Sequence, residues 1–146
     1  MKAKTSLALI LFSLVGCRGE EVARVKLVKN GDEAQTSWTT NGTTKAKVWA
    51  EYNGKWTGGK TPDIVYEVEL LDGDKSIGKT ECKTSTCGAR VCSNEVNING
   101  NGSGDCECQT SCTLEAPKDG TYTVKATVKD ASAMTEAKDL SIIIRK

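Results

Sequence analysis

The sequence contains no histidine among its 146 residues. Histidine is the side chain that most often acts as a general base near neutral pH, and it is the commonest metal ligand. Its absence excludes Ser-His-Asp triads and every metal site that needs an imidazole ligand. No other combination of residues typical of an active site is recognisable. We therefore predict a protein that is not an enzyme and that has no cofactor or metal.

The chain also has almost no excess of charge of either sign. Its 20 Lys and Arg residues against 19 Asp and Glu residues give a net charge of +1. Without residues 1–16, which hold Lys2 and Lys4, the balance is 18 basic against 19 acidic residues, a net charge of −1. Because nucleic-acid-binding proteins carry a clear basic surplus, we do not expect nucleic acid to be a partner.

No hydrophobic run in the sequence is long enough to cross a membrane. The longest apolar stretch, Leu7–Val15, has nine residues, whereas a membrane-spanning helix needs about 20. It follows a short segment that contains Lys2 and Lys4. A basic start followed by a short apolar run is typical of an export signal.

The residues that end this run, Leu14-Val15-Gly16-Cys17, resemble the lipobox of bacterial lipoproteins. The resemblance implies cleavage before Cys17, a thioether-linked diacylglycerol on its sulfur and acylation of its new amino group. Residues 1–16 would then be a signal peptide, and residues 17–21 a lipid anchor with a short tether. Arg18, and not Asp, follows the cysteine. By the sorting rule of enteric bacteria this implies the outer membrane, in either its periplasmic or its surface leaflet. An ordinary signal peptide with an incidental cysteine is the alternative.

Six further cysteines lie within a stretch of 31 residues. They are Cys82, Cys87, Cys92, Cys106, Cys108 and Cys112. An even number of cysteines in an exported chain predicts disulfides, here up to three, in any of many pairings. A thiolate metal cluster is the alternative, but it lacks paired Cys-x2-Cys motifs, and an oxidising compartment disfavours free thiolates.

The rest of the chain alternates between apolar and polar residues with a period of two. We expect strands at Val22–Val28, Ala34–Thr40, Lys45–Tyr52, Ile64–Leu71, Lys75–Cys82, Thr121–Lys129 and around Leu140, Ile142 and Ile144. No window of 12 or more residues carries a helical stripe. Short strands separated by turn residues predict an all-β protein, with one antiparallel β-sandwich over residues 22–146.

The segment Pro117–Asp130 resembles the penultimate strand of bacterial immunoglobulin-like and fibronectin-like domains. An Asp-Gly turn leads to Tyr122, alternating apolar residues follow, and an Asp closes the segment. Tyr66–Leu71 with the following Asp72-Gly73 resembles a central strand and hairpin of the same fold. The resemblance implies a single immunoglobulin-like sandwich in which the Tyr122 hydroxyl binds nearby backbone, as in a tyrosine corner.

The stretch Cys82–Cys112 departs from this family pattern. Without it the mature chain would have 99 residues, close to the roughly 100 of one such sandwich. Its main aliphatic residues are Ala89, Val91, Val96 and Ile98. We therefore predict a disulfide-dependent insert that is separable from the sandwich and that carries recognition.

Two further features are candidate binding sites. Trp38, Trp49 and Trp56 either form a platform on which a glycan stacks or pack in the core, and Trp49 and Trp56 are kept as a possible binding face. The segment Asn97–Asp105 has the oxygen spacing of a calcium loop but not its carboxylates, so we interpret it as a polar, Gly-rich loop.

These features together predict a lipid-anchored, non-catalytic protein of the bacterial outer membrane or cell surface. Its expected role is protein docking or adhesion, for example within motility or adhesion machinery. The expected partners are the membrane, through the anchor on Cys17, and an envelope protein. The alternative is an accessory protein that binds a glycan or another small ligand through exposed Trp residues or the disulfide-linked loop.

Overall fold

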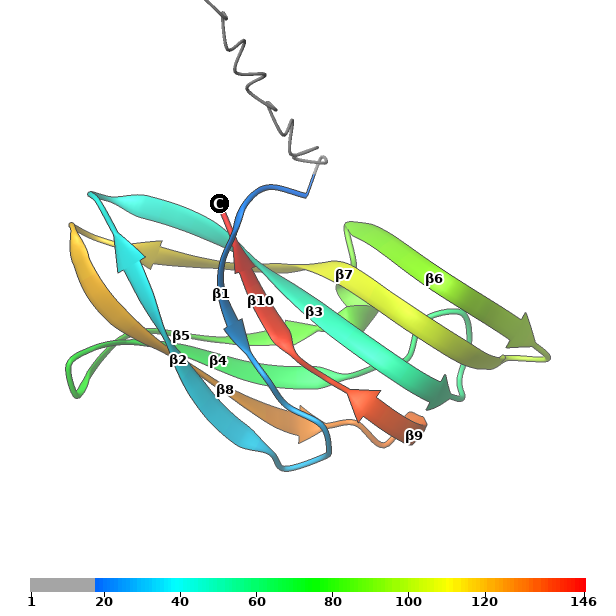
Figure 1. The fold of residues 1–146 in the computed structure, drawn as a ribbon. Helices are drawn as coiled ribbons and strands as arrows, with labels where there is room; N and C mark the ends of the chain where they lie inside the picture. The colour runs from blue at the N-terminus through cyan, green and yellow to red at the C-terminus, as the bar shows by residue number, and fades with distance from the viewer. Residues whose placement is uncertain (1–17) are drawn as a thin grey trace, which may run out of the picture.

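The computed structural model describes residues 18–146, which are almost entirely strand (Figure 1). Cys17 and the expected signal peptide lie outside the described residues. The strands are β1 (Glu21–Val25), β2 (Glu33–Thr40), β3 (Thr44–Trp56), β4 (Val65–Asp72), β5 (Lys75–Lys83), β6 (Ala89–Ile98), β7 (Asn101–Ala116), β8 (Gly120–Asp130), β9 (Met134–Asp139) and β10 (Ile142–Arg145). A single 3-10 turn, η1 (Thr84–Thr86), joins β5 to the segment before β6.

The strands form two antiparallel sheets that pack face to face. One sheet has the order β1-β10-β3-β7-β6, with β9 paired to β3, and the other has the order β2-β8-β4-β5. In Figure 1 the two sheets form the two layers of the molecule, and β6 lies at one end of it. The prediction of an all-β antiparallel sandwich is confirmed.

The core between the sheets consists of the residues that alternate along each strand. On β8 the inward residues are Tyr122, Val124, Ala126 and Val128, and β4 and β10 contribute Tyr66, Val68, Leu70, Ile142 and Ile144. All of these side chains are buried. Because each fully buried aliphatic side chain contributes roughly 1.5–3 kcal/mol, this period-two pattern is the main source of stability.

The tyrosine-corner expectation is also met. The buried Tyr122 hydroxyl donates a hydrogen bond to the Lys118 carbonyl, four residues upstream, at 2.9 Å. The six strands β3–β8 follow the immunoglobulin arrangement, with β3-β7-β6 in one sheet and β8-β4-β5 in the other. However, β2 pairs with β8 and β10 pairs with β3, at the positions where an immunoglobulin domain places its last and first strands.

The structure corrects the expected division between a sandwich and a separable Cys-rich insert. Strand β7 lies between β3 and β6 and pairs with β3 from Ala116, opposite Thr44, to Gly102, opposite Trp56. Its cysteines Cys106 and Cys108 are buried in the common core. Cystine sulfur fills positions that aliphatic side chains occupy in other strands, so the stretch 82–112 is part of the sandwich.

The expected tether over residues 17–21 is corrected as well, because the chain is held to the domain from Arg18 onward. The Arg18 guanidinium contacts the Glu107 carboxylate at 3.0 Å. The backbone of Glu20 exchanges two hydrogen bonds with that of Lys146, both at 3.0 Å, and β1 begins at Glu21. No free spacer therefore separates residue 18 from the sandwich.

Candidate functional site

The six clustered cysteines form three disulfides, as the sequence predicts. Their Cα–Cα distances are 5.7 Å for Cys82–Cys112, 5.5 Å for Cys87–Cys108 and 4.1 Å for Cys92–Cys106. The pairing is nested, because the first cysteine binds the last and the third binds the fourth. The bonds therefore join β5, the η1 segment and β6, in turn, to one strand, β7.

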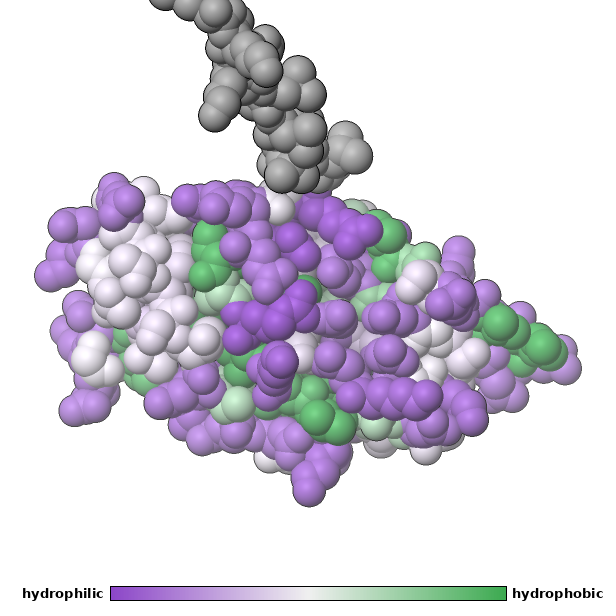
Figure 2. Space-filling view, viewed as in Figure 1, coloured by the Kyte–Doolittle hydropathy of each residue, from purple (hydrophilic) through white to green (hydrophobic). Residues whose placement is uncertain are grey.

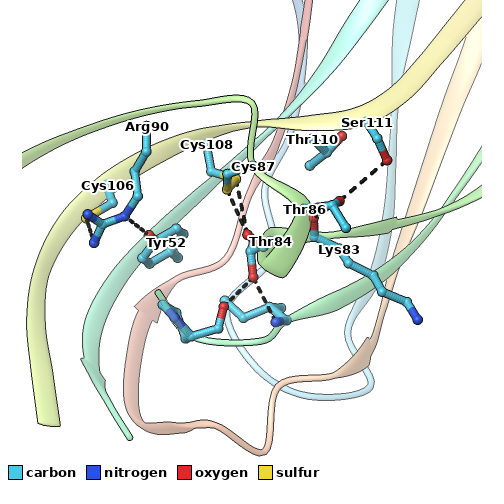
Figure 3. The surroundings of a disulfide bond; sticks show 12 residues. Tyr52, Lys83, Thr84, Thr86, Cys87, Arg90, Cys106, Cys108, Thr110 and Ser111 are labelled. Atoms are coloured by element: carbon cyan, nitrogen blue, oxygen red, sulfur yellow. Dashed lines mark hydrogen bonds between the residues drawn. A yellow bond between two sulfur atoms is a disulfide. The ribbon is translucent and has the colours of Figure 1, made fainter. Parts of the chain in front are cut away.

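A buried threonine fixes the base of the β6–β7 hairpin. The Thr84 hydroxyl accepts a hydrogen bond from the Ile64 amide at 2.8 Å and donates one to the Pro62 carbonyl. Figure 3 shows Thr84 directly beside the Cys87–Cys108 disulfide. The crossover from β5 to β6 is thus attached both to the start of β4 and to β7, which limits its movement.

Arg90 fills the inner face of β6. Its Nε donates to the Tyr52 hydroxyl at 2.7 Å, and its Nη2 contacts the Lys60 carbonyl at 2.9 Å and the Glu95 carboxylate at 2.7 Å (Figure 3 shows the contact with Tyr52). Burial raises the pKa of Tyr52, and the hydrogen bond from Arg90 lowers the pKa of Glu95. The inner face is therefore occupied by polar contacts and is closed to a ligand.

The outer face of β6 carries three exposed aliphatic side chains, which we call the β6 apolar row: Val91, Val96 and Ile98. Their exposed fractions are 42%, 52% and 64%. Figure 2 shows hydrophobic residues gathered at the end of the molecule formed by the hairpin. Val96 and Ile98 also line a shallow surface hollow of about 460 Å³ together with Trp56 and Lys55. In the sequence these residues stand out only as the few aliphatic residues of the Cys-rich stretch.

The backbone of β6 has a free edge. Among residues 18–146 this ten-residue strand pairs with β7 alone, contains neither Pro nor Lys, and has one irregularity in its register, between Ser93 and Val96. Cys92 and Cys106 lie opposite each other with a Cα separation of 4.1 Å, which is typical of a non-hydrogen-bonded pair. The N–H and C=O groups of Cys92 therefore point away from β7, toward the open side.

The prediction of a binding face on Trp49 and Trp56 is wrong. Their exposed fractions are 3% and 1%, and Trp38 is also buried. Trp49 lies on the outer face of its sheet, but the Arg145 guanidinium covers its ring at 5.7 Å. Trp56 packs edge-on against Tyr52, with ring centroids 5.5 Å apart. None of the three indoles is free to stack on a sugar.

The remaining candidate, Asn97–Asp105, is not a long loop: it spans the end of β6, the two-residue turn at 99–100 and the start of β7. Across residues 18–146 no cluster of three or more Cys, Asp or Glu side chains is placed to hold a metal ion. In the same part of the chain, no helix is long and apolar enough to span a membrane. The free edge and outer face of β6 are thus the features best suited to contact another molecule.

Comparisons with known proteins add no relative. No family model matches the sequence, and no curated protein matches it.

Proposed function

We propose that the protein is a lipid-anchored, non-catalytic docking module of the bacterial envelope that holds a protein partner along the free edge of β6. The lipobox-like segment Leu14–Cys17 supports the anchor. The geometry of β6 supports the docking role. The envelope assembly concerned, for example one for adhesion or motility, would be identified through the partner.

The observation that carries the docking role is the open edge of β6 from Ala89 to Ser93, before the irregularity in its register between Ser93 and Val96. Natural sheets usually blunt an edge with Lys, Pro, a β-bulge or a very short strand, because an open edge can pair with another chain. The edge strand β5 follows this rule, since it contains Lys75, Lys79 and Lys83. Strand β6 has ten residues and its two charged side chains, Arg90 and Glu95, are paired with each other. This edge is suited to strand addition by an extended segment of a partner.

The disulfides favour binding because they hold the edge in a fixed shape. Cys87–Cys108 and Cys92–Cys106 attach β6 and the segment before it to β7, and Arg90 attaches β6 to Tyr52. A partner that pairs with β6 does not need to order it first. Affinity rises when this ordering cost is removed.

The anchor is tested by labelling cells with a fatty acid. Cys17→Ala should abolish both incorporation of labelled palmitate and cleavage of the signal peptide, since the acyl chains and the cleavage site depend on this cysteine. Gly16→Ala is the matched control, because it keeps a small residue before the cysteine and should leave labelling intact. Labelling of the Cys17→Ala protein would contradict the anchor.

The docking edge is tested by photo-crosslinking in the native envelope. A photoreactive side chain at Ser93, exposed on β6, should give one discrete protein adduct. The same group at Lys79, exposed on β5, an edge strand of the other sheet, should give none. Adducts from Lys79 without adducts from Ser93 would contradict docking at β6.

A further inference from the structure

We propose that the β6 apolar row lies in the interface of the same bilayer that carries the acyl chains, so that the sheet containing β1, β10, β3, β7 and β6 faces the membrane. The proposal rests on the lipid anchor proposed above. It assigns a lipid surface, and not a protein, to the outer face of β6.

The first argument is the length of chain between the anchor and the domain. Arg18 follows Cys17 directly and is bound to Glu107, on the outer face of β7. The Gly19 carbonyl accepts a hydrogen bond from Arg145 at 3.3 Å, and Glu20 pairs with Lys146. Consecutive Cα atoms are about 3.8 Å apart. The acyl chains on Cys17 would therefore begin about one residue from the surface of the sandwich, which keeps the domain at the membrane.

The second argument is that the apolar row lies on the same face as this attachment. Val91 is the register partner of Glu107, the residue that binds Arg18. Arg18, Val91 and Glu107 line one surface hollow. Val96 and Ile98 are the partners of Ser103 and Asn101, which alternate along β7 on the same face as Glu107. The anchor and the row thus belong to one continuous surface.

The third argument is the chemistry around the row. Its neighbours on the outer face of the hairpin are the polar residues Ser93 and Ser103 and the carboxylates Asp105 and Glu107. Glu107 is neutralised by Arg18 and Arg145, and Lys55 is neutralised by Glu136. Exposed aliphatic side chains within a polar rim suit the boundary between headgroups and acyl chains. Binding through them should not require anionic lipid, because no cluster of unpaired basic side chains accompanies the row.

This orientation is compatible with docking along the edge. Side chains on the outer face point out of the sheet, whereas the free N–H and C=O groups of β6 lie in the plane of the sheet. With the outer face on the bilayer, the edge of β6 would be directed along the membrane surface. A neighbouring membrane protein could pair with it there.

The test uses the lipidated full chain in nanodiscs of phosphatidylcholine that contain lipids spin-labelled near the top of the acyl chain. Methyl resonances of Val91, Val96 and Ile98 should broaden strongly. Val28 and Ile77, which are 49% and 36% exposed on other parts of the domain, are the controls and should stay sharp. Equal behaviour of the row and the controls in disc-bound protein would overturn the proposal. Failure of the chain to co-purify with the discs would instead contradict the anchor.

A double variant tests whether the aliphatic side chains themselves produce the membrane contact. The double substitution Val96→Ser and Ile98→Ser should lower the equilibrium constant for membrane contact, read from the Val91 methyl groups, about tenfold. Ile77→Ser should leave it unchanged. Replacing part of the phosphatidylcholine with phosphatidylglycerol should also have no effect, and a strong dependence would overturn the apolar mechanism. Shifts of the row that vary with protein concentration without lipid would assign the surface to a second copy of the chain.

Discussion

Replacing Cys82 and Cys112 together by alanine should destabilise the domain more than replacing Cys92 and Cys106. The two bonds close loops with sequence separations of 30 and 14 residues. In the chain-entropy model, loops of these lengths give about 3.6 and about 3.0 kcal/mol of stabilisation. Loop entropy alone therefore predicts only a small difference in the free energy of unfolding.

The packing around the two disulfides makes the expected difference in the free energy of unfolding larger. Cys82 and Cys112 are both buried, and their bond joins β5 in one sheet to β7 in the other. Cys92 is only half-buried, and its bond links two neighbouring strands of one sheet that already share a ladder. Removing buried sulfur leaves a cavity between the sheets that costs more than the same change near the surface. We expect a loss of about 4–6 kcal/mol for the first pair and about 3 kcal/mol for the second.

The assay is urea unfolding without reductant, followed by tryptophan fluorescence, since all three indoles are buried. The midpoint for the Cys82/Cys112 variant should lie well below that for the Cys92/Cys106 variant, with similar slopes. An equal loss in both, or a larger loss for Cys92/Cys106, would refute the argument that the Cys-rich stretch belongs to the core.

Three other changes test particular contacts. Tyr122→Phe removes the hydrogen bond of the tyrosine corner and should cost about 1–2 kcal/mol in thermal or urea unfolding. Gly54→Ala should lower the free energy of unfolding by about 2–4 kcal/mol, because the φ of Gly54 is 145° and a Cβ there would collide with a carbonyl of β9. Gly58→Ala is the control: its Cβ would meet nothing, and it should cost about 1 kcal/mol. The pKa of Glu95 is lowered from 4.5 by Arg90, so its stabilisation is present above about pH 4.5 and is lost as the pH falls. Glu95→Gln should therefore reduce the acid-induced loss of stability, and an unchanged pH profile would contradict the ion pair.

Much of the fold could be predicted from the sequence because sheet faces impose a period of two. The alternation over Thr121–Lys129 gave the correct inward residues of β8, and the Asp-Gly before Tyr122 gave the corner. Strand order could not be predicted in this way. Pairings such as β2 with β8 join residues about 90 positions apart in the sequence, and local patterns carry no information on them.

The place of the Cys-rich stretch was missed although a signal for it exists. Cys106, Cys108, Thr110, Cys112, Leu114 and Ala116 alternate along β7, and all are buried. Counting cysteine as an apolar residue reveals a long period-two strand, which scanning for aliphatics alone overlooks. The pairing of Cys92 with Cys106 follows from the register of β6 and β7, and the other two pairings follow from the packing of β5 and the η1 segment against β7, which only the structure gives.

Trp49 is a residue whose burial could not be predicted from the local strand pattern. The residue shares the outer face of β3 with Lys47 and Glu51, so the strand pattern correctly places it away from the core. Its burial depends on Ile143 and Arg145 from β10, almost a hundred residues later. A side chain covered by distant cross-strand neighbours cannot be distinguished by local sequence from one that faces water.

The nested disulfides of the hairpin also determine how mechanical tension would pass through the molecule. A pull on an ordinary edge strand peels it away, one pair of hydrogen bonds after another. Here the Cys92–Cys106 and Cys87–Cys108 bonds are covalent, so β6 cannot be separated from β7 past Cys92. Tension applied at β6 would instead pass into β7 and its long ladder with β3, and from there through β10 to the pairing of Glu20 with Lys146. A pull on β6 would thus be carried to the N-terminal segment beside the proposed lipid anchor, while β6 stays covalently joined to β7.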